Sequence, residues 1–132
     1  MNDQLAIVVP ADFTDSQPVL FTVGESYDFL ANAVGGMISC ISLDNGMDMW
    51  VNDEYLYNGD EFSPFATAVY WKTFGLFSHY VNGAVVFTGG VDYEGNTVGL
   101  TFEQLSYIGN LLLEFGHDLD LSPIMANFAN RT

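Results

Sequence analysis

Two adjacent residues, Asn45 and Gly46, constrain the fold of this 132-residue chain more than any other pair. Both tolerate a positive φ, which the tight turns of β-hairpins require. Apolar, strand-like runs lie on either side of them, at residues 37–43 and 47–52. The pattern therefore predicts two antiparallel strands joined by a tight turn. The single cysteine, Cys40, lies in the first of these runs and is expected to be a buried thiol.

The other elements follow from capping signals and apolar spacing. Ser63 and Pro64 are typical of a helix start, and Thr101 with Gln104 forms a capping box. We expect strands at 5–9 and 83–88, helices at 25–34, 64–73 and 102–115, a loop with extended pieces at 10–24, and a loop or second hairpin at 89–99. The apolar stripe of the last helix is expected to be Phe102, Leu105, Ile108, Leu112 and Phe115.

These elements predict an α+β fold, a mostly antiparallel sheet covered by two to four helices. We expect one compact domain over residues 1–132, in which residues 117–132 form a C-terminal tail or a short helix. Hydrophobic residues make up 49% of the chain, which is enough for a sizeable core.

Charge is the most unusual property of the composition. The chain has 17 acidic residues and two basic ones, Lys72 and Arg131, so its net charge is −15. Such a chain repels nucleic acid and anionic lipid and attracts basic proteins, above all those that bind nucleic acid themselves. We therefore expect a basic protein as partner, and neither direct nucleic-acid binding nor membrane binding. The alternative is that the acidity serves only solubility or growth at high salt.

The acidic residues are grouped along the chain. Six lie on the predicted hairpin and the loop after it: Asp44, Asp48, Asp53, Glu54, Asp60 and Glu61. Duplex DNA carries one charge per ~1.7 Å of its axis, so carboxylates that imitate it must gather on one face. We expect these six to form a carboxylate ridge that binds the partner. The simpler interpretation is that loops are acidic in any acidic protein.

Aromatic residues are concentrated between residues 70 and 80. One short helix cannot bury all of them, so Trp71, Phe74 and Phe77 are candidate interface residues. This excess predicts a homodimer. Without surrounding Lys or Arg, nucleic-acid stacking on these rings is excluded.

No catalytic, cofactor or metal motif is present. The chain has no Cys-x-x-Cys, His-Glu-x-x-His, phosphate loop or dinucleotide fingerprint, and the acids around His117 and Asp92 are better explained by a helix end and a hairpin tip. We expect a protein without enzymatic activity, cofactor or metal. The first residues lack a basic signal-peptide region, and no apolar stretch reaches the ~18 residues of a membrane span, so we expect a cytoplasmic protein.

Several short motifs resemble an uncharacterised small-domain family found largely in bacteriophages, plasmids and other mobile elements. The resemblance covers about residues 5–115. Its motifs are Val-Gly-Gly-Met-Ile at 34–38, Trp-Val-Asn-Asp-Glu at 50–54, Pro-Phe-Ala-Thr-Ala at 64–68, Gly-Ala-Val-Val-Phe-Thr-Gly at 83–89 and Gly-Leu-Thr at 99–101. It implies an α+β fold and a phage or plasmid gene product, and it supplies no catalytic residues.

Together, charge and resemblance predict a phage-encoded inhibitor without enzymatic activity. It would act in the host cytoplasm on a basic host protein, such as a restriction enzyme, a CRISPR effector or another DNA-binding protein, by occupying its nucleic-acid site. One alternative is a module that binds a small ligand or a signalling nucleotide. Another is an acidic enzyme with paired carboxylates.

Overall fold

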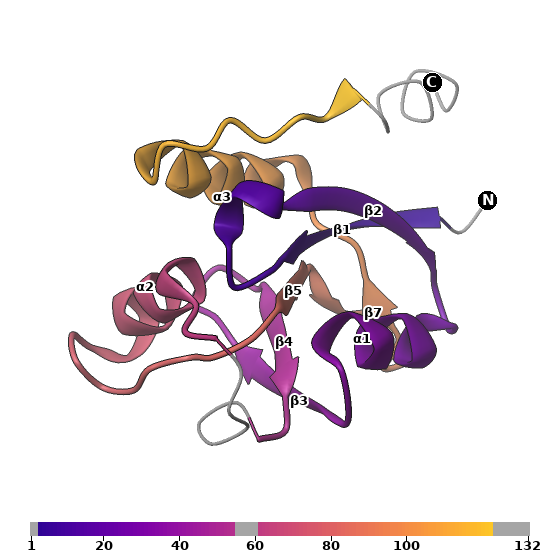
Figure 1. Cartoon of the computed structure of the whole chain (residues 1–132). Coiled ribbons are helices and arrows are strands. Elements are labelled where there is room, and N and C mark those ends of the chain that lie inside the picture. Colours follow the sequence, from indigo (N-terminus) through magenta and orange to yellow (C-terminus); the bar gives the residue numbers. More distant parts are fainter. Residues whose placement is uncertain (1–2, 55–60, 123–132) are drawn as a thin grey trace.

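The structure is a computed structural model that describes residues 3–54 and 61–122 (Figure 1). In chain order its elements are β1 (Asp3–Val9), a 3-10 turn η1 (Phe13–Asp15), β2 (Gln17–Thr22), α1 (Ser26–Val34), β3 (Ile38–Ser42), β4 (Asp48–Asn52), α2 (Pro64–Phe74), β5 (Val85–Thr88), β6 (Gly90–Val91), β7 (Thr97–Val98) and α3 (Phe102–Glu114).

Five strands form one antiparallel sheet in the order β2-β1-β5-β4-β3. Two hairpins, β1–β2 and β3–β4, lie on either side of β5, which joins them. Val86 on β5 is opposite Val8 on β1 and Trp50 on β4. A separate two-stranded sheet, β6–β7, follows β5 directly.

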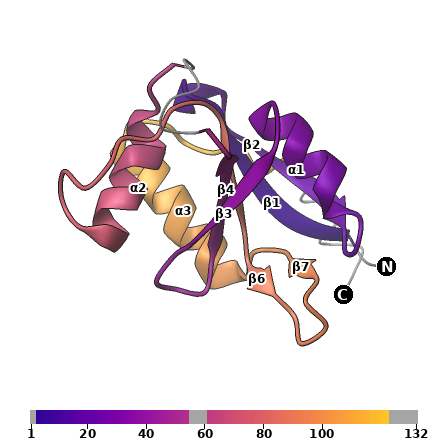
Figure 2. The ribbon, with the colours of Figure 1, turned by 90° about the horizontal axis from the view of Figure 1, so that it is seen from below.

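Helices cover both faces of the sheet (Figure 2). The larger core lies on the side of α2 and α3, where Phe65 and Ile108 are fully buried. The smaller core lies under α1, around Leu30 and Val86. Because side chains alternate along a strand, Met49 faces the larger core and Trp50 the smaller one. The predicted α+β fold with a mostly antiparallel sheet is confirmed.

The predicted hairpin turn and the predicted capping box, which both depend on residues close in sequence, are confirmed. The turn at Gly46 has φ of 79°, and Leu43 donates to the Met47 carbonyl across it at 2.8 Å. The capping box of Thr101 and Gln104 is formed at the start of α3.

One element prediction was too coarse and one was wrong. Residues 10–24 were expected to be a loop with extended pieces, and one such piece is β2, an edge strand that accommodates Pro18 because an edge residue need not donate on its outer side. Phe102 was expected in the apolar stripe of α3 but is 82% exposed, and Leu111 is buried instead. The expected short helix near the C-terminus falls mainly on residues 123–132, outside the described residues.

Among the described helices, none combines the length and the apolar character needed to cross a lipid bilayer.

Candidate functional site

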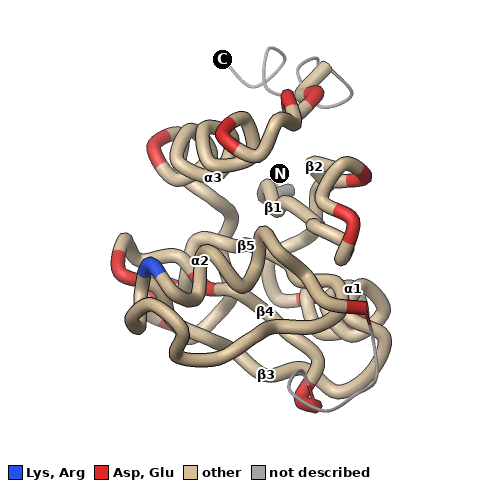
Figure 3. The backbone as a smooth tube through the Cα atoms, turned by 60° about the vertical axis from the view of Figure 1, so that its left-hand side comes forward, with Lys and Arg blue, Asp and Glu red and all other residues tan. Residues whose placement is uncertain are grey.

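The carboxylates are spread over the whole molecule. Of the acidic residues whose exposure is described, thirteen are exposed, Asp92 is half-buried and Asp48 is buried. Figure 3 shows acidic positions near α1, near α3, on the loops and along the β3–β4 hairpin. Lys72 is the one basic residue in the described part of the chain. The negative field therefore surrounds the described surface rather than marking one face.

The predicted carboxylate ridge is not assembled on the hairpin. Asp44 lies in the turn between β3 and β4, whereas Asp53 lies at the open end, where its N–H donates to the Met37 carbonyl at 2.7 Å. Met37 is about six residues from the turn along the hairpin, or roughly 20 Å at ~3.4 Å per residue. Asp44 and the pair Asp53–Glu54 are thus at opposite ends.

Asp48 is absent from any exposed ridge because it is only 8% exposed. It lies on β4, on the face that carries Trp50, and is opposite Ser42 on β3 and Thr88 on β5. Burial raises the pKa of its carboxyl, and hydrogen bonds from Cys40 and Ser42 lower it in part. Asp48 was expected at the surface because it is charged. The alternation of side chains along β4, which puts Asp48 on the same face as Trp50, was not taken into account.

Cys40 corrects another expectation. It is exposed on β3 rather than buried in the core. Partial burial of the thiol, followed by the charge and the hydrogen bond of Asp48, raises its pKa to about 12. The thiol is therefore protonated at neutral pH and a poor nucleophile.

The last two acids of the predicted ridge are placed in part. Asp60 lies outside the described residues. Glu61 is exposed and precedes Phe62, which forms an isolated bridge with Asn82. Asp53, Glu54 and Glu61 are thus exposed and available to a partner, without a continuous row that joins them to Asp44.

The aromatic residues predicted as an interface, unlike the acidic ones, lie largely in contact with one another. Rings of four residues contact one another in a chain, with centroids 5.7 Å apart for Phe62–Tyr80, 5.6 Å for Tyr80–Trp71 and 5.0 Å for Trp71–Phe77. We call Phe62, Trp71, Phe77 and Tyr80 the aromatic patch. Phe77 is 72% exposed, Tyr80 58% and Phe62 46%. Phe74, also predicted, is 50% exposed but contacts Tyr70 instead.

Phe62 was missed as a member of this patch. It lies nine residues before Trp71, and only the bridge to Asn82 brings it beside Tyr80. No periodic signal in the sequence announces such a bridge, because both residues lie outside regular strands.

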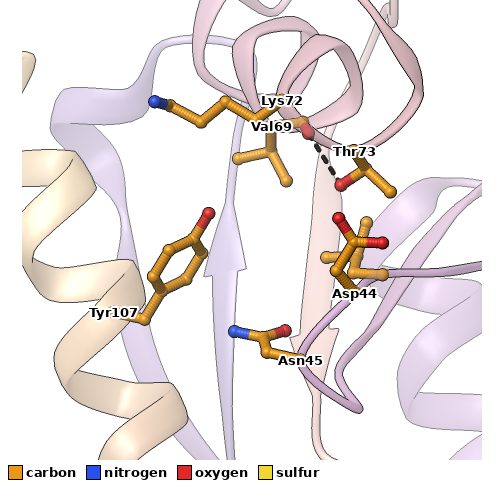
Figure 4. A pocket seen from close by; sticks show the side chains of 7 residues that line it. Asp44, Asn45, Val69, Lys72, Thr73 and Tyr107 are labelled. Atoms are coloured by element: carbon orange, nitrogen blue, oxygen red, sulfur yellow. Dashed lines mark hydrogen bonds between the residues drawn. The ribbon is translucent and has the colours of Figure 1, made fainter.

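A shallow pocket of about 230 Å³ lies between the β3–β4 turn, α2 and α3. Figure 4 shows the Tyr107 hydroxyl of α3 directed toward the Lys72 side chain of α2, Asp44 beside Thr73, and Asn45 of the turn below them. The pocket offers one cation, one carboxylate, an amide and the Tyr107 hydroxyl to a small polar ligand, whereas the Thr73 hydroxyl already donates to the Val69 carbonyl at 3.1 Å. Among the described residues, no three His, Cys, Asp or Glu side chains come together as a metal site.

The motif residues of the family resemblance have structural roles. Asn52 donates through Nδ2 to the Val34 carbonyl at the end of α1 at 3.2 Å and accepts from the Glu54 N–H at 2.9 Å. A side chain at Gly36 would place its Cβ 2.9 Å from Asn52 Nδ2, so glycine leaves room for this contact. A Cβ at Gly99 would lie 2.6 Å from the Leu5 backbone nitrogen. These motifs thus hold α1, β4 and β1 in place.

No curated protein and no solved structure matches this chain. A family model does match, described as a domain of unknown function, DUF3846, and it covers residues 6–113. This span runs from within β1 to the last turn of α3 and so includes all strands of the sheet except the first three residues of β1, together with the aromatic patch and the pocket. The chain therefore belongs to the DUF3846 family.

Proposed function

We propose that this protein is an inhibitor without enzymatic activity, encoded by a bacteriophage or another mobile element, that binds a basic, nucleic-acid-binding protein in the host cytoplasm. We propose a restriction enzyme, a CRISPR effector or another DNA-binding protein as the class of target. One observation carries the proposal: thirteen carboxylates are exposed on the described surface, against the single described base Lys72. Basic nucleic-acid-binding surfaces are the natural complement of such a field.

The spread of the carboxylates favours one mode of action over another. A field on all sides accelerates the approach of a basic partner from any direction and weakens as salt shortens the Debye length from ~10 Å at 0.1 M to ~3 Å at 1 M. It does not by itself fix an orientation. We therefore propose that charge brings the partner in and that other contacts determine how it is held.

Capture from a nuclease-treated host lysate tests the proposal. The tagged protein should retain a basic host protein at about 0.1 M salt and release it at about 1 M, where the Debye length is ~3 Å. The purified target should then lose its binding to duplex DNA or RNA when this protein is added. Retention of the same proteins by an unrelated protein of equal charge, or a target whose nucleic-acid binding is unaffected, would contradict it.

A second candidate function rests on the pocket beside Lys72. In a chain so poor in bases, a lysine that lines a pocket with Tyr107 and Asn45 suits a small ligand with one anionic group, and Asp44 in the same lining suits a donor on that ligand. A thermal-shift screen of amino acids and nucleotides tests this. A stabilising ligand should lose its effect with Lys72→Met and retain it with Lys72→Arg.

A further inference from the structure

The exposed apolar surface around α2 reaches the size of the patches that are often functional in monomeric proteins. Five large side chains there are 46–72% exposed: Phe62, Phe74, Leu76, Phe77 and Tyr80. Together they amount to about three fully exposed side chains, or roughly 450–750 Å² at ~150–250 Å² each. The largest apolar patch of a typical monomer is about 300–600 Å² and is often functional.

The aromatic patch is also held in a fixed arrangement. The Trp71 indole Nε1 donates to the His79 carbonyl at 2.7 Å, and the Gly75 N–H donates to the Trp71 carbonyl at 2.8 Å. Phe77 has φ of 64°, a left-handed backbone that is costly for a bulky residue. Burial does not explain this strain, since the Phe77 ring is 72% exposed. The strained backbone instead presents the ring beside Trp71 at the surface.

The ring planes suit a cation better than a flat apolar partner. Phe77 is inclined to Trp71 by 64°, and Tyr80 is inclined to Trp71 by 57°. Inclined rings can direct more than one face toward the same bound group, as in the aromatic cages that hold cationic ligands. Lys72, the neighbouring cation, lines the pocket with Asp44 and Tyr107 instead.

Charge and area distinguish the occupant of the patch. A second copy of this chain carries the same net charge of −15, which opposes self-association. A standard interface buries about 800 Å² per partner, more than the exposed apolar surface around α2 offers to a second copy of this chain. A basic segment gains from the field and can place one charged side chain near Glu61, the exposed residue that precedes Phe62.

We propose that the aromatic patch is the docking site for a basic segment of the partner and that an arginine of that segment lies against Trp71, Phe77 and Tyr80. This inference rests on the proposed function, because it takes the partner to be basic. Arginine is favoured over lysine because its planar guanidinium stacks on aromatic faces and is more weakly hydrated. The patch would then supply the orientation that the dispersed field lacks.

The two tryptophans give the test an internal control. Trp71 lies in the patch, whereas Trp50 is on β4, with its indole donating to Thr88 Oγ1 at 2.9 Å. A synthetic peptide of alternating glycine and arginine, titrated at about 0.15 M salt, should shift the indole NMR signal of Trp71 and leave that of Trp50 in place. The matched glycine–lysine peptide should bind more weakly.

Substitutions then locate the contact. Phe77→Gly removes the ring and suits the positive φ, and Phe77→Asn does the same while retaining a side chain. Both should weaken arginine-peptide binding about 2–30-fold and reduce the preference for arginine over lysine. Tyr93→Ala removes an aromatic that is 96% exposed on the β6–β7 turn and should change neither. Thermal melting of each variant checks that the fold persists.

Three results would overturn the inference. The first is that wild type and both Phe77 variants bind the arginine peptide equally well. The second is equal affinity for the two peptides without a shift of the Trp71 indole signal, and the third is a wild-type dimer that either Phe77 substitution dissociates. The first two leave the proposed function standing, since charge alone would then hold the partner. Failure of the proposed function is seen separately, when the lysate capture retains no basic nucleic-acid-binding protein.

Discussion

At the scale of the residue, Asp48 and Cys40 form a coupled pair on the sheet face that carries Trp50. The carboxyl is buried, and both its charge and its hydrogen bond act on the thiol. Neither residue was placed correctly from the sequence, because residue type favours an exposed aspartate and a buried cysteine. The positions of these residues on β3 and β4 instead bury Asp48 and expose Cys40.

The thiol of Cys40 should react slowly despite its exposure. A pKa of about 12 against an ordinary 9.0 leaves about 1,000-fold less thiolate at neutral pH. Alkylation by iodoacetamide, followed by mass spectrometry, should be slow in the wild type and faster in Asp48→Asn, which removes the charge. Ser42→Ala retains that charge and should not accelerate the reaction. Wild-type alkylation at the rate of an ordinary thiol would contradict this account.

Asp48 should also make stability depend on pH. Its pKa is raised in the folded state, so its contribution is most favourable below the unfolded pKa near 3.8 and is lost as pH rises through the folded pKa. Asp48→Asn removes this cost at neutral pH. Urea denaturation should show the variant more stable than wild type at pH 7, with a smaller gain at pH 3.5. An equal gain at both pH values would point to packing instead.

Asn52 should be a large contributor to stability for its size. Asn52→Ala leaves the Val34 carbonyl and the Glu54 N–H without this partner and should cost about 1–3 kcal/mol of unfolding free energy. Asn52→Asp retains the acceptor for Glu54 but turns a carboxylate oxygen toward the Val34 carbonyl at the C-terminal end of α1, so at pH 7 it should cost at least as much. Urea denaturation at pH 7 measures both, with the exposed Asn110→Ala as control. Equal stability of all three variants would remove the proposed role.

At the scale of the element, α3 is fixed at its start by a residue that acts twice. Gln104 Oε1 accepts from the Thr101 N–H at 2.9 Å, as the capping box predicts. Its Nε2 also donates to the Asn45 carbonyl at 3.0 Å, which ties the helix to the β3–β4 turn. The first contact is local and readable from four residues of sequence. The second joins residues 59 positions apart and could not be predicted.

Gln104→Ala should therefore cost more than the loss of a cap alone. We expect about 1–2 kcal/mol of unfolding free energy for the cap and the buried contact together. Gln104→Glu retains the acceptor for Thr101, but a carboxylate oxygen then faces the Asn45 carbonyl, so its cost reports the loss of the tie to the turn rather than of the cap. Hydrogen exchange at the β3–β4 turn should accelerate in both variants. Unchanged exchange there would show that the tie to the turn contributes nothing.

The difference between local and long-range contacts also explains which parts of the fold could be predicted from the sequence. The hairpin turn, the N-cap at Ser63 and the sheet-forming runs depend on near neighbours and were predicted. The strand β2 has Pro18 in it and pairs only along one edge, so its sequence resembles a loop. The positive φ of Phe77 and the bridge of Phe62 arise from long-range packing and leave no periodic trace.

At the scale of the whole molecule, the number of carboxylates should matter more than their position for the approach of a partner. Asp53, Glu54, Asp60 and Glu61 can be changed to their amides, which removes four charges while retaining shape. Each exposed pair is worth ~0.2–1 kcal/mol, so the quadruple variant should weaken binding of the captured target by about 1–4 kcal/mol, mainly through the association rate.

A second variant that loses the same number of charges distinguishes the effect of overall charge from that of a specific contact. It carries the amides of four exposed acids on and after α3: Glu103, Glu114, Asp118 and Asp120. If the field alone acts, stopped-flow association rates should fall equally in both quadruple variants. A loss confined to the 53–61 set would instead place a specific contact near Phe62.

The order of strands has a consequence for how the chain is made. The ribosome completes both hairpins before it reaches β5, yet β5 joins them, and Ile7 finds its neighbour Phe87 only then. Isolated two-stranded hairpins are marginal in water, so the growing chain holds two unconnected pieces until residues 85–88 emerge. Pulse proteolysis of ribosome-bound chains of increasing length would time that step. Synthesis halted before Val85 thus leaves apolar edges open to aggregation rather than half of a domain.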